Sequence, residues 1–352
     1  MFSLYAGAYS FLGLFSGPLT DRWGPRGVVA LGGLLLGAGL ALAGSIHSLA
    51  PLYAAYLVAA FGMSTAYVPC TSTVARWFTA RRGLAVGLAM SGAGVGIFAC
   101  PPLVALLLER VGWRSAYAVL GAVLCLSLGM LSLLLVPAPG ARGLPCGGAG
   151  RETAIGSPAR GQWPLARVLR HSSFLALLGV YTSTWMPVFM PLVHLVPLAR
   201  DLGLGPVVGA TALSALGAGS LVGRLGLGAL SDVIGRRPAL GLALALQAVG
   251  FAGLGLAGSA AGLLGAATVY GFSYGAVTAL MPAIVTDFYG AARAGSLVGL
   301  IFGIAGPPGA LGPLLGGWVF DATGRYTLAF AAGAGLNVVA LGLLLLARPP
   351  RS

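Results

Sequence analysis

Residues 17–26 read GPLTDRWGPR, and residues 228–237 read GALSDVIGRR. The two segments match at five places with a single offset of 211 residues. The matched pairs are Gly17 and Gly228, Leu19 and Leu230, Asp21 and Asp232, Gly24 and Gly235, and Arg26 and Arg237. Glycine and arginine also mark tight loops in unrelated chains, but five matches in one register favour an internal repeat. The sequence therefore predicts a molecule built from two related halves.

The composition around these segments is that of a membrane protein. The chain has 352 residues, of which 58% are hydrophobic and 8% are charged, and its mean hydropathy is +0.94. A soluble globular domain carries about 25% charged residues, and no soluble core could bury this much apolar surface. The composition therefore excludes a soluble enzyme and a disordered protein, and it predicts an all-α protein that crosses the membrane many times.

Eleven apolar runs are long enough to cross a bilayer, which takes about 17–25 residues. They cover residues 3–19, 27–46, 51–76, 84–108, 113–136, 172–199, 207–230, 237–257, 261–287, 294–319 and 326–347. The only long hydrophilic interval follows the fifth run. We therefore expect a five-helix half, a cytoplasmic linker, a six-helix half and a cytoplasmic tail. Their expected bounds are 1–136, 137–170, 171–348 and 349–352.

The placement of arginine predicts the orientation. The net charge of +13 comes from 20 basic residues, all of them arginine, and no basic stripe or aromatic platform indicates a nucleic-acid partner. One side of the predicted topology carries Arg22, Arg26, Arg76, Arg81, Arg82, Arg142, Arg151, Arg160, Arg167, Arg170, Arg236, Arg237, Arg293, Arg348 and Arg351. The other side carries Arg110, Arg114, Arg200 and Arg325. Cytoplasmic loops are enriched in positive charge, so we expect a multi-pass protein of the plasma membrane with a cytoplasmic C-terminus.

The repeated loop, G-x-L-x-D-R-x-G-x-R in its first copy, resembles the signature between the second and third helices of the major facilitator superfamily. Three further stretches resemble its monocarboxylate-transporter branch, including the bacterial relatives of oxalate/formate antiporters. They are RWFTARRGLAVGLA at 76–89, YGFSYG at 270–275 and LGPLLGGWVFDATGRY at 311–326. The resemblance covers almost the whole chain. It implies the major facilitator fold, with two helical bundles around a central cavity.

The two predicted halves are unequal. Two spans precede the motif at 228–237, whereas one precedes the motif at 17–26, so the family's first helix is missing. Related halves should have equal helix counts. We therefore expect the open reading frame to extend upstream of Met1 by about 30–50 residues, enough for one span of about 20 residues with a loop and tail.

Arg224 is the ionisable residue that interrupts the apolar pattern of a predicted span. An ionisable side chain at membrane depth is costly and indicates a functional site, and a guanidinium offers a carboxylate a planar pair of donors. The resemblance implies that an arginine at this place in the family's eighth helix takes part in carboxylate binding. The alternative is a structural arginine that leans toward the cytoplasmic loop. Proton-coupled relatives carry an aspartate one turn earlier, where this chain has Ser220.

Other candidates for ligand contact are rings with polar tips inside predicted spans. They are Tyr181, Tyr270, Tyr274 and His194, with Trp185 beside them. The resemblance implies that the cavity is lined partly from these helices. The alternative is that these rings pack between helices or lie at the membrane interface.

The repeated loops also predict a gate. Asp21 and Asp232 lie just before helix starts, where negative charge is favoured by the helix dipole. The resemblance implies that they form a cytoplasmic latch with the neighbouring arginines, which breaks when the halves rock. The expected gating residues are Asp21, Arg22, Arg26, Asp232, Arg236 and Arg237. The alternative, plain positive-inside anchoring, explains the arginines but not the matched aspartates.

These features predict a secondary transporter rather than an enzyme. The sequence has no G-x-x-x-x-G-K-[ST] loop for ATP and no metal or cofactor motif. We expect alternating-access transport of a small monocarboxylate of the lactate, pyruvate, formate or oxalate class. The lipid bilayer and a proton or a counter-anion are its further expected partners, for symport or exchange. The alternatives are a superfamily exporter of another small solute, and a truncated membrane protein that does not transport.

Overall fold

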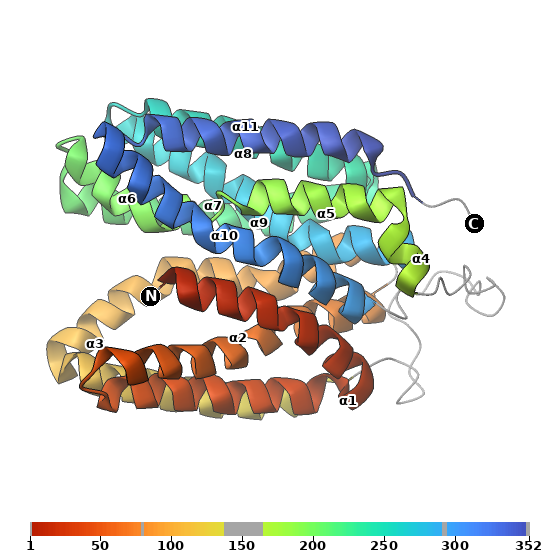
Figure 1. The fold of residues 1–352 in the computed structure, drawn as a ribbon, viewed down its shortest axis with the longest axis horizontal. Helices are drawn as coiled ribbons and strands as arrows, with labels where there is room; N and C mark the ends of the chain where they lie inside the picture. Colours follow the sequence, from red (N-terminus) through yellow and green to blue (C-terminus); the bar gives the residue numbers. More distant parts are fainter. Residues whose placement is uncertain (1, 79–80, 137–164, 291–293, 350–352) are drawn as a thin grey trace.

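The computed structural model describes residues 2–78, 81–136, 165–290 and 294–349 (Figure 1). In these residues, ten segments are long and apolar enough to cross a membrane. The helices are α1 (Phe2–Ser45), α2 (Leu49–Trp77), α3 (Arg82–Ser132), α4 (Leu165–Arg170), α5 (Ser172–Trp185), α6 (Met190–Asp201), α7 (Gly205–Ile234), α8 (Arg236–Leu256), α9 (Ala260–Tyr289), α10 (Ala294–Thr323) and α11 (Thr327–Leu346).

Two of these helices are long enough to cross twice. Helix α1 has 44 residues and would measure about 66 Å at 1.5 Å per residue, twice the roughly 30 Å thickness of a hydrocarbon core. Its backbone leaves the helical region at Gly24 (φ 77°, ψ 163°), and α3 does the same at Gly112 (φ 72°, ψ 167°). Figure 1 shows α1 turning back on itself. The ten segments already count α3 as two crossings and α1 as one. Dividing α1 at Gly24 therefore gives eleven crossings, the number predicted from the sequence.

The matched glycines of the repeat have matching backbones. Gly235 ends α7 with φ 93° and ψ 157°, close to the values at Gly24. A positive φ of this size is accessible to glycine and strained for other residues. Each motif therefore needs its glycine to reverse the chain between two crossings.

The predicted span at 172–199 is interrupted. Helix α5 ends at Trp185, α6 begins at Met190, and Pro187 lies between them. A proline lacks the N–H that would continue the α-helical ladder, and short i to i+3 bonds replace it at Val188 and Met190. The carbonyl of Val188, in this interruption, accepts a hydrogen bond from Tyr270 Oη at 2.6 Å.

The crossings lie in two groups (Figure 1). Helices α1, α2 and α3 form the first group, and helices α5 to α11 form the second. Most of the predicted linker lies outside the described residues, and its last six residues form α4. The strongest contacts between the groups pair α1 with α10 and α3 with α7.

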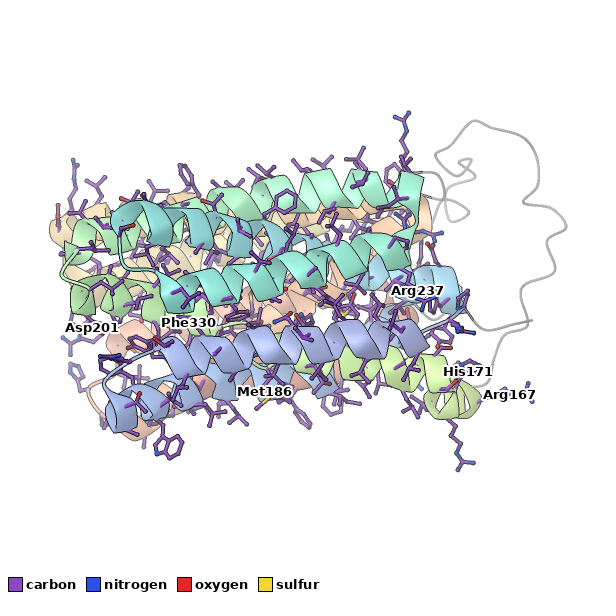
Figure 2. The ribbon with its side chains drawn as sticks, turned by 90° about the horizontal axis from the view of Figure 1, so that it is seen from above. Arg167, His171, Met186, Asp201, Arg237 and Phe330 are labelled. Carbon is purple, nitrogen blue, oxygen red and sulfur yellow. The ribbon has the colours of Figure 1, made fainter. Side chains whose placement is uncertain are left out.

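Glycines bring the groups into close contact at one end of the molecule. A Cβ atom on Gly17 of α1 would lie 2.3 Å from the carbonyl oxygen of Gly295, and one on Gly83 of α3 would lie 2.2 Å from that of Gly228. We call the end that holds these contacts and Arg237 the arginine-rich end. Figure 2 shows Arg237 at this end and Asp201 at the opposite end. The small residues close the molecule here.

Candidate ligand cavity

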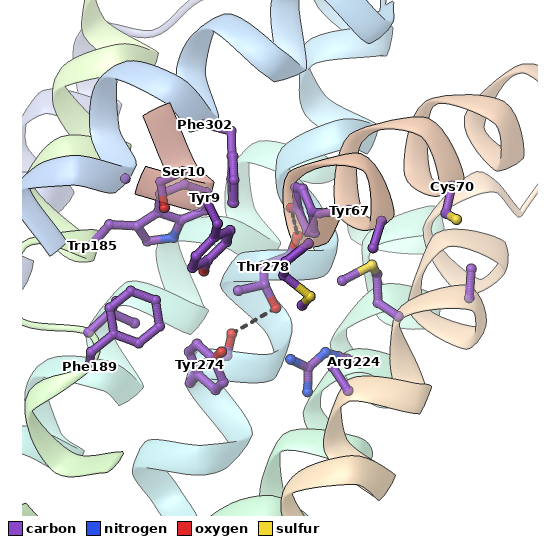
Figure 3. Close-up of a pocket in the computed structure, with 17 residues that line it drawn as sticks. Tyr9, Ser10, Tyr67, Cys70, Trp185, Phe189, Arg224, Tyr274, Thr278 and Phe302 are labelled. Carbon is purple, nitrogen blue, oxygen red and sulfur yellow. Dashed lines mark hydrogen bonds between the residues drawn. The ribbon is translucent and has the colours of Figure 1, made fainter. Parts of the chain in front are cut away.

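A cavity of about 370 Å³ lies between the two groups (Figure 3). Both groups supply its walls, which are mostly aromatic rings, methionines and alanines. The lining residues are Tyr9, Ser10, Met63, Ala66, Tyr67, Cys70, Ala89, Met90, Ala93, Trp185, Val188, Phe189, Arg224, Tyr274, Thr278, Phe302 and Gly306. An apolar cavity with a few placed polar groups is the usual form of a small-molecule site.

Arg224 supplies the positive charge of this cavity. Its side chain is 1% exposed, and its Nη1 donates to the hydroxyl of Ser220 and, at 3.2 Å, to the Ser220 carbonyl. Its Cζ lies 5.4 Å from the centre of the Tyr274 ring. Its Nε has no hydrogen-bond partner, and no carboxylate among the described residues forms an ion pair with it. A buried charge without a counter-charge favours binding of an anion.

Of the other predicted contact residues, Tyr274 and Trp185 line the cavity, and three do not. Tyr274 lines it and stacks on Tyr270, with ring centroids 6.2 Å apart and an angle of 4° between the planes. Tyr270 lies behind this ring. Tyr181 is fully buried and packs edge-on against Trp185 at 5.8 Å. The structure thus brings Arg224, Tyr274 and Trp185 to the cavity, while Tyr270 and Tyr181 lie outside its lining.

His194 lies outside the cavity lining and joins three helical segments. Its Nε2 donates to the Pro313 carbonyl at 2.8 Å, and its Nδ1 lies 3.2 Å from Tyr326 Oη. A carbonyl only accepts, so the proton resides on Nε2, and Nδ1 accepts from the tyrosine. With both ring nitrogens occupied, this histidine has a structural role in the conformation described here.

The sequence analysis did not identify several residues of the cavity wall, among them Phe302, Tyr67 and Tyr9. Phe302 stacks on Tyr67 at 4.9 Å, and Tyr9 and Trp185 pack against the same ring at 5.6 and 5.2 Å. Tyr67 Oη also donates to the Thr278 carbonyl at 2.8 Å and so connects the groups. The signal used for Tyr181, a hydroxyl-bearing ring within a span, applies equally to Tyr9 and Tyr67. Phe302 carries no such signal.

The first repeated aspartate connects the groups at the arginine-rich end. Asp21, in α1, accepts from the backbone N–H of Ser296 at 3.0 Å and from its hydroxyl at 2.6 Å. Ser296 lies in the first turn of α10, where the helix dipole favours a negative charge. Arg76, at the end of α2, forms an ion pair with Asp21.

The second repeated aspartate makes the corresponding connection. Asp232, in α7, accepts from the N–H groups of Gly83 and Leu84 at 2.9 and 3.0 Å, at the start of α3. Arg236 forms an ion pair with Asp232 at 2.5 Å. We call the contacts of Asp21 with α10 and of Asp232 with α3 the two aspartate latches.

A further ion pair crosses between the groups beside the second latch. Asp287, near the end of α9, pairs with Arg82 of the first group and with Arg236 of its own group. Because Arg236 contacts both Asp232 and Asp287, it joins the latch to this second crossing.

Arg236 joins the expected latch, whereas the other three motif arginines do not pair with the latch aspartates. Arg26 donates to the carbonyls of Leu133 and Leu135 at 2.6 and 2.7 Å, within the first group. Arg237 donates to the carbonyls of residues 344 and 345 at 3.2 and 2.7 Å, within the second group. Arg22 is exposed. Carbonyls at a helix C-terminus lack intrahelical partners and carry partial negative charge, so these arginines bind them instead of the latch aspartates.

The described residues contain no group of three histidine, cysteine or acidic side chains placed to hold a metal ion. The cavity presents one guanidinium, several hydroxyls and many rings. This arrangement suits reversible binding of an organic anion.

Comparisons with known proteins agree with this architecture. The family model of the Major Facilitator Superfamily matches residues 1–302 and 173–352. Monocarboxylate transporter 13 of Rattus norvegicus is 34% identical over 331 residues, which cover 93% of this chain and 74% of that protein. Monocarboxylate transporter 11 of Homo sapiens is 32% identical over 328 residues, covering 90% and 68%. The crystal structure of the human organic anion transporter MFSD10 (TETRAN) has a TM-score of 0.76 at 18% identity, covering 97% of this chain and 83% of that chain, which shows a shared fold.

Proposed function

This chain belongs to the major facilitator superfamily and, within it, to the monocarboxylate transporters, and we propose that it carries a monocarboxylate by alternating access. The observation that carries the proposal is Arg224, a buried guanidinium on the wall of a cavity between two helical groups. The superfamily consists of membrane transporters rather than enzymes, and the printed names of the sequence relatives include monocarboxylate transport.

Arg224 binds the carboxylate in this proposal. Ser220 occupies its Nη1, while its Nε is left without a partner. A carboxylate that reaches this edge of the guanidinium satisfies the free N–H and neutralises the charge at once. Tyr274, whose ring lies beside the guanidinium, completes this end of the site.

The two aspartate latches form the gate. Each holds the arginine-rich end shut by joining an aspartate of one group to a helix start of the other. We assign this end to the cytoplasm because of its arginines, with the C-terminus cytoplasmic and the chain in the plasma membrane. The described conformation is then closed to the cytoplasm, and inward release of the ligand requires both latches to break.

Proton symport and anion exchange are the two coupling modes of the proposal. No carboxylate or histidine stands among the described cavity-lining residues, and Ser220 takes the place one turn before Arg224. These residues therefore support anion exchange, in which a counter-anion binds Arg224. A proton would need an acceptor beyond these lining residues.

Transport by purified protein in liposomes tests the proposal. We expect uptake of labelled lactate, pyruvate, formate or oxalate, and loss of at least tenfold in Arg224→Ala and Arg224→Lys, since a lysine cannot reproduce the guanidinium fork. Arg110→Ala, an exposed arginine on α3, is the matched control. Undiminished uptake by Arg224→Ala would refute the role of this arginine. Comparing uptake driven by a pH gradient with uptake driven by internal unlabelled acid separates symport from exchange.

Export of another small solute is a second candidate, favoured by the apolar lining of the cavity. The positive charge of Arg224 opposes lipophilic cations there. Efflux of such a cation from loaded liposomes, without uptake of any carboxylate, would replace the first proposal with this one.

A further inference from the structure

The cavity is larger than the smallest monocarboxylates require. Its volume of about 370 Å³ corresponds to about twelve water volumes of roughly 30 Å³ each. Lactate and pyruvate, which are small acids, would leave most of that space unfilled. An apolar space left unfilled deprives its walls of van der Waals contacts, so a larger ligand fits this cavity better.

The charge of the cavity lies on one side, and the rings of Trp185 and Phe189 lie on the other. Figure 3 shows Arg224 across the pocket from Trp185 and Phe189, with Tyr274 and Thr278 between them. A ligand that reaches both sides must be anionic at one end and apolar at the other.

The apolar side is built from rings that hold one another in place. Phe302 and Trp185 are each 5% exposed, and their rings meet edge-on, with centroids 5.2 Å apart and an angle of 86° between the planes. The Tyr67 ring stacks on Phe302 with an angle of 19° between the planes. Aromatic rings favour such edge-on and offset contacts at 4.5–7 Å. The wall is therefore preformed and presents rings to which a further ring can pack.

The site disfavours an ammonium group. None of the described lining residues is acidic, so a ligand ammonium would have no carboxylate partner, and Arg224 would repel it. This separates aryl acids without an amine from aromatic amino acids.

We propose that the ligand is an aryl-substituted monocarboxylate without an ammonium group, of the arylpyruvate or arylacetate kind. Its carboxylate binds Arg224, and its ring lies against Trp185, Phe189 and Phe302. This inference rests on the proposed function and narrows its substrate class.

Binding is tested through Cys70, which lines the cavity. Cys100 and Cys125 lie outside the lining, and Cys146 lies outside the described residues, so Cys100→Ala, Cys125→Ala and Cys146→Ser together leave Cys70 as the single thiol. The rate of its reaction with N-ethylmaleimide in liposomes is measured against ligand concentration. We expect phenylpyruvate to protect at a concentration about tenfold or more below pyruvate, from the burial of its ring, and phenylalanine not to protect.

A variant that reduces the space for the ring makes the test specific. Ala93 faces the cavity from α3, and Ala93→Phe should raise the half-protective concentration of phenylpyruvate by a larger factor than that of pyruvate. Val95→Phe, on an exposed position of the same helix, is the control and should leave both unchanged.

The outcomes separate the two proposals. Equal protection by pyruvate and phenylpyruvate, or stronger protection by pyruvate, overturns the aryl assignment and leaves carboxylate transport standing. Protection by phenylalanine equal to that by phenylpyruvate overturns the exclusion of an ammonium group. Absence of both protection and uptake for every carboxylate overturns the proposed function itself.

Discussion

Asp21 and Asp232, which lie 211 residues apart, each accept a backbone N–H at the start of a helix in the opposite helical group. Asp21 binds Ser296 at the start of α10, and Asp232 binds Gly83 and Leu84 at the start of α3. The repeat in the sequence is thus also a repeat of contacts. The two latches lie at the same end of the molecule, and each leaves its carboxylate largely shielded from solvent.

Removing the charge of either latch should open the arginine-rich end. Hydrogen bonds to charged groups contribute about 1.5–3 kcal/mol. The two aspartate side chains are 18% and 12% exposed, so we expect Asp21→Asn or Asp232→Asn to lower the closed-to-open ratio by about tenfold. Val68 is fully buried in a cluster whose other buried members all come from α4 and the second group. Val68→Cys, without other thiols, should therefore react faster with maleimide in these variants.

The control for the latch variants is Asp201→Asn, at the opposite end of the molecule (Figure 2). It should leave the labelling of Val68→Cys unchanged. Equal labelling in all three variants would mean that the latches do not hold this end closed.

Replacing Arg224 by methionine should stabilise the protein while abolishing transport. A buried charge without a counter-charge is costly, and hydrophobic replacements of buried ionic groups are often stabilising by about 1–4 kcal/mol. We expect Arg224→Met to have a higher Tm in detergent than the parent. Added carboxylate should raise the Tm of the parent and not that of the variant. A lower Tm for Arg224→Met would assign this arginine a structural role instead.

A methyl group at the crossing of α3 and α7 should prevent closure. A Cβ at Gly83 would lie 2.2 Å from the Gly228 carbonyl oxygen, whereas one at Gly92 or Gly96 of the same helix meets nothing within 4 Å. We expect Gly83→Ala to reduce uptake at least tenfold and to increase labelling of Val68→Cys. Gly92→Ala should transport normally, since it adds a methyl to the same helix without a clash.

The paired arginines Arg26 and Arg237 should affect stability rather than gating. Each binds carbonyls within its own group, and exposed contacts of this kind contribute about 1 kcal/mol or less. Arg26→Ala and Arg237→Ala should lower the Tm by similar small amounts, with unchanged labelling of Val68→Cys. Arg22→Ala, an exposed neighbour in the same motif, is the control. Faster labelling of Val68→Cys in either variant would show that these arginines take part in gating.

The fold was predictable because its signals are strong and repeated. Apolar runs of membrane length predicted the all-helical architecture, and the repeated loop with three further stretches predicted the major facilitator superfamily. Both predictions are confirmed. The matched glycines Gly24 and Gly235 reverse the chain at equivalent points. The interruption of 172–199 was missed, although Pro187 and Pro191 lay in the run, because prolines are tolerated within many membrane helices.

The site was predictable only where chemistry contrasts with its surroundings. Arg224 is a charge in an apolar run and so stands out. Tyr270 and Tyr274 are one turn apart on α9, and a helix that is apolar on all sides gives no periodic signal for which ring meets the cavity. The latch partners were missed for another reason. These partners are backbone N–H groups of Gly83 and Ser296. Every residue except proline has such a donor, so the residue types do not indicate which ones bind the aspartates.

The pair of latches has a mechanical consequence. One point of attachment would leave the two groups free to swivel, whereas two separate points define a line. In the proposed mechanism, the two groups tilt about that line while both latches are engaged. The opposite end of the molecule then narrows around a bound ligand while Asp21 and Asp232 keep their partners. Enclosure of the ligand and release of the latches are then separate events that occur in sequence.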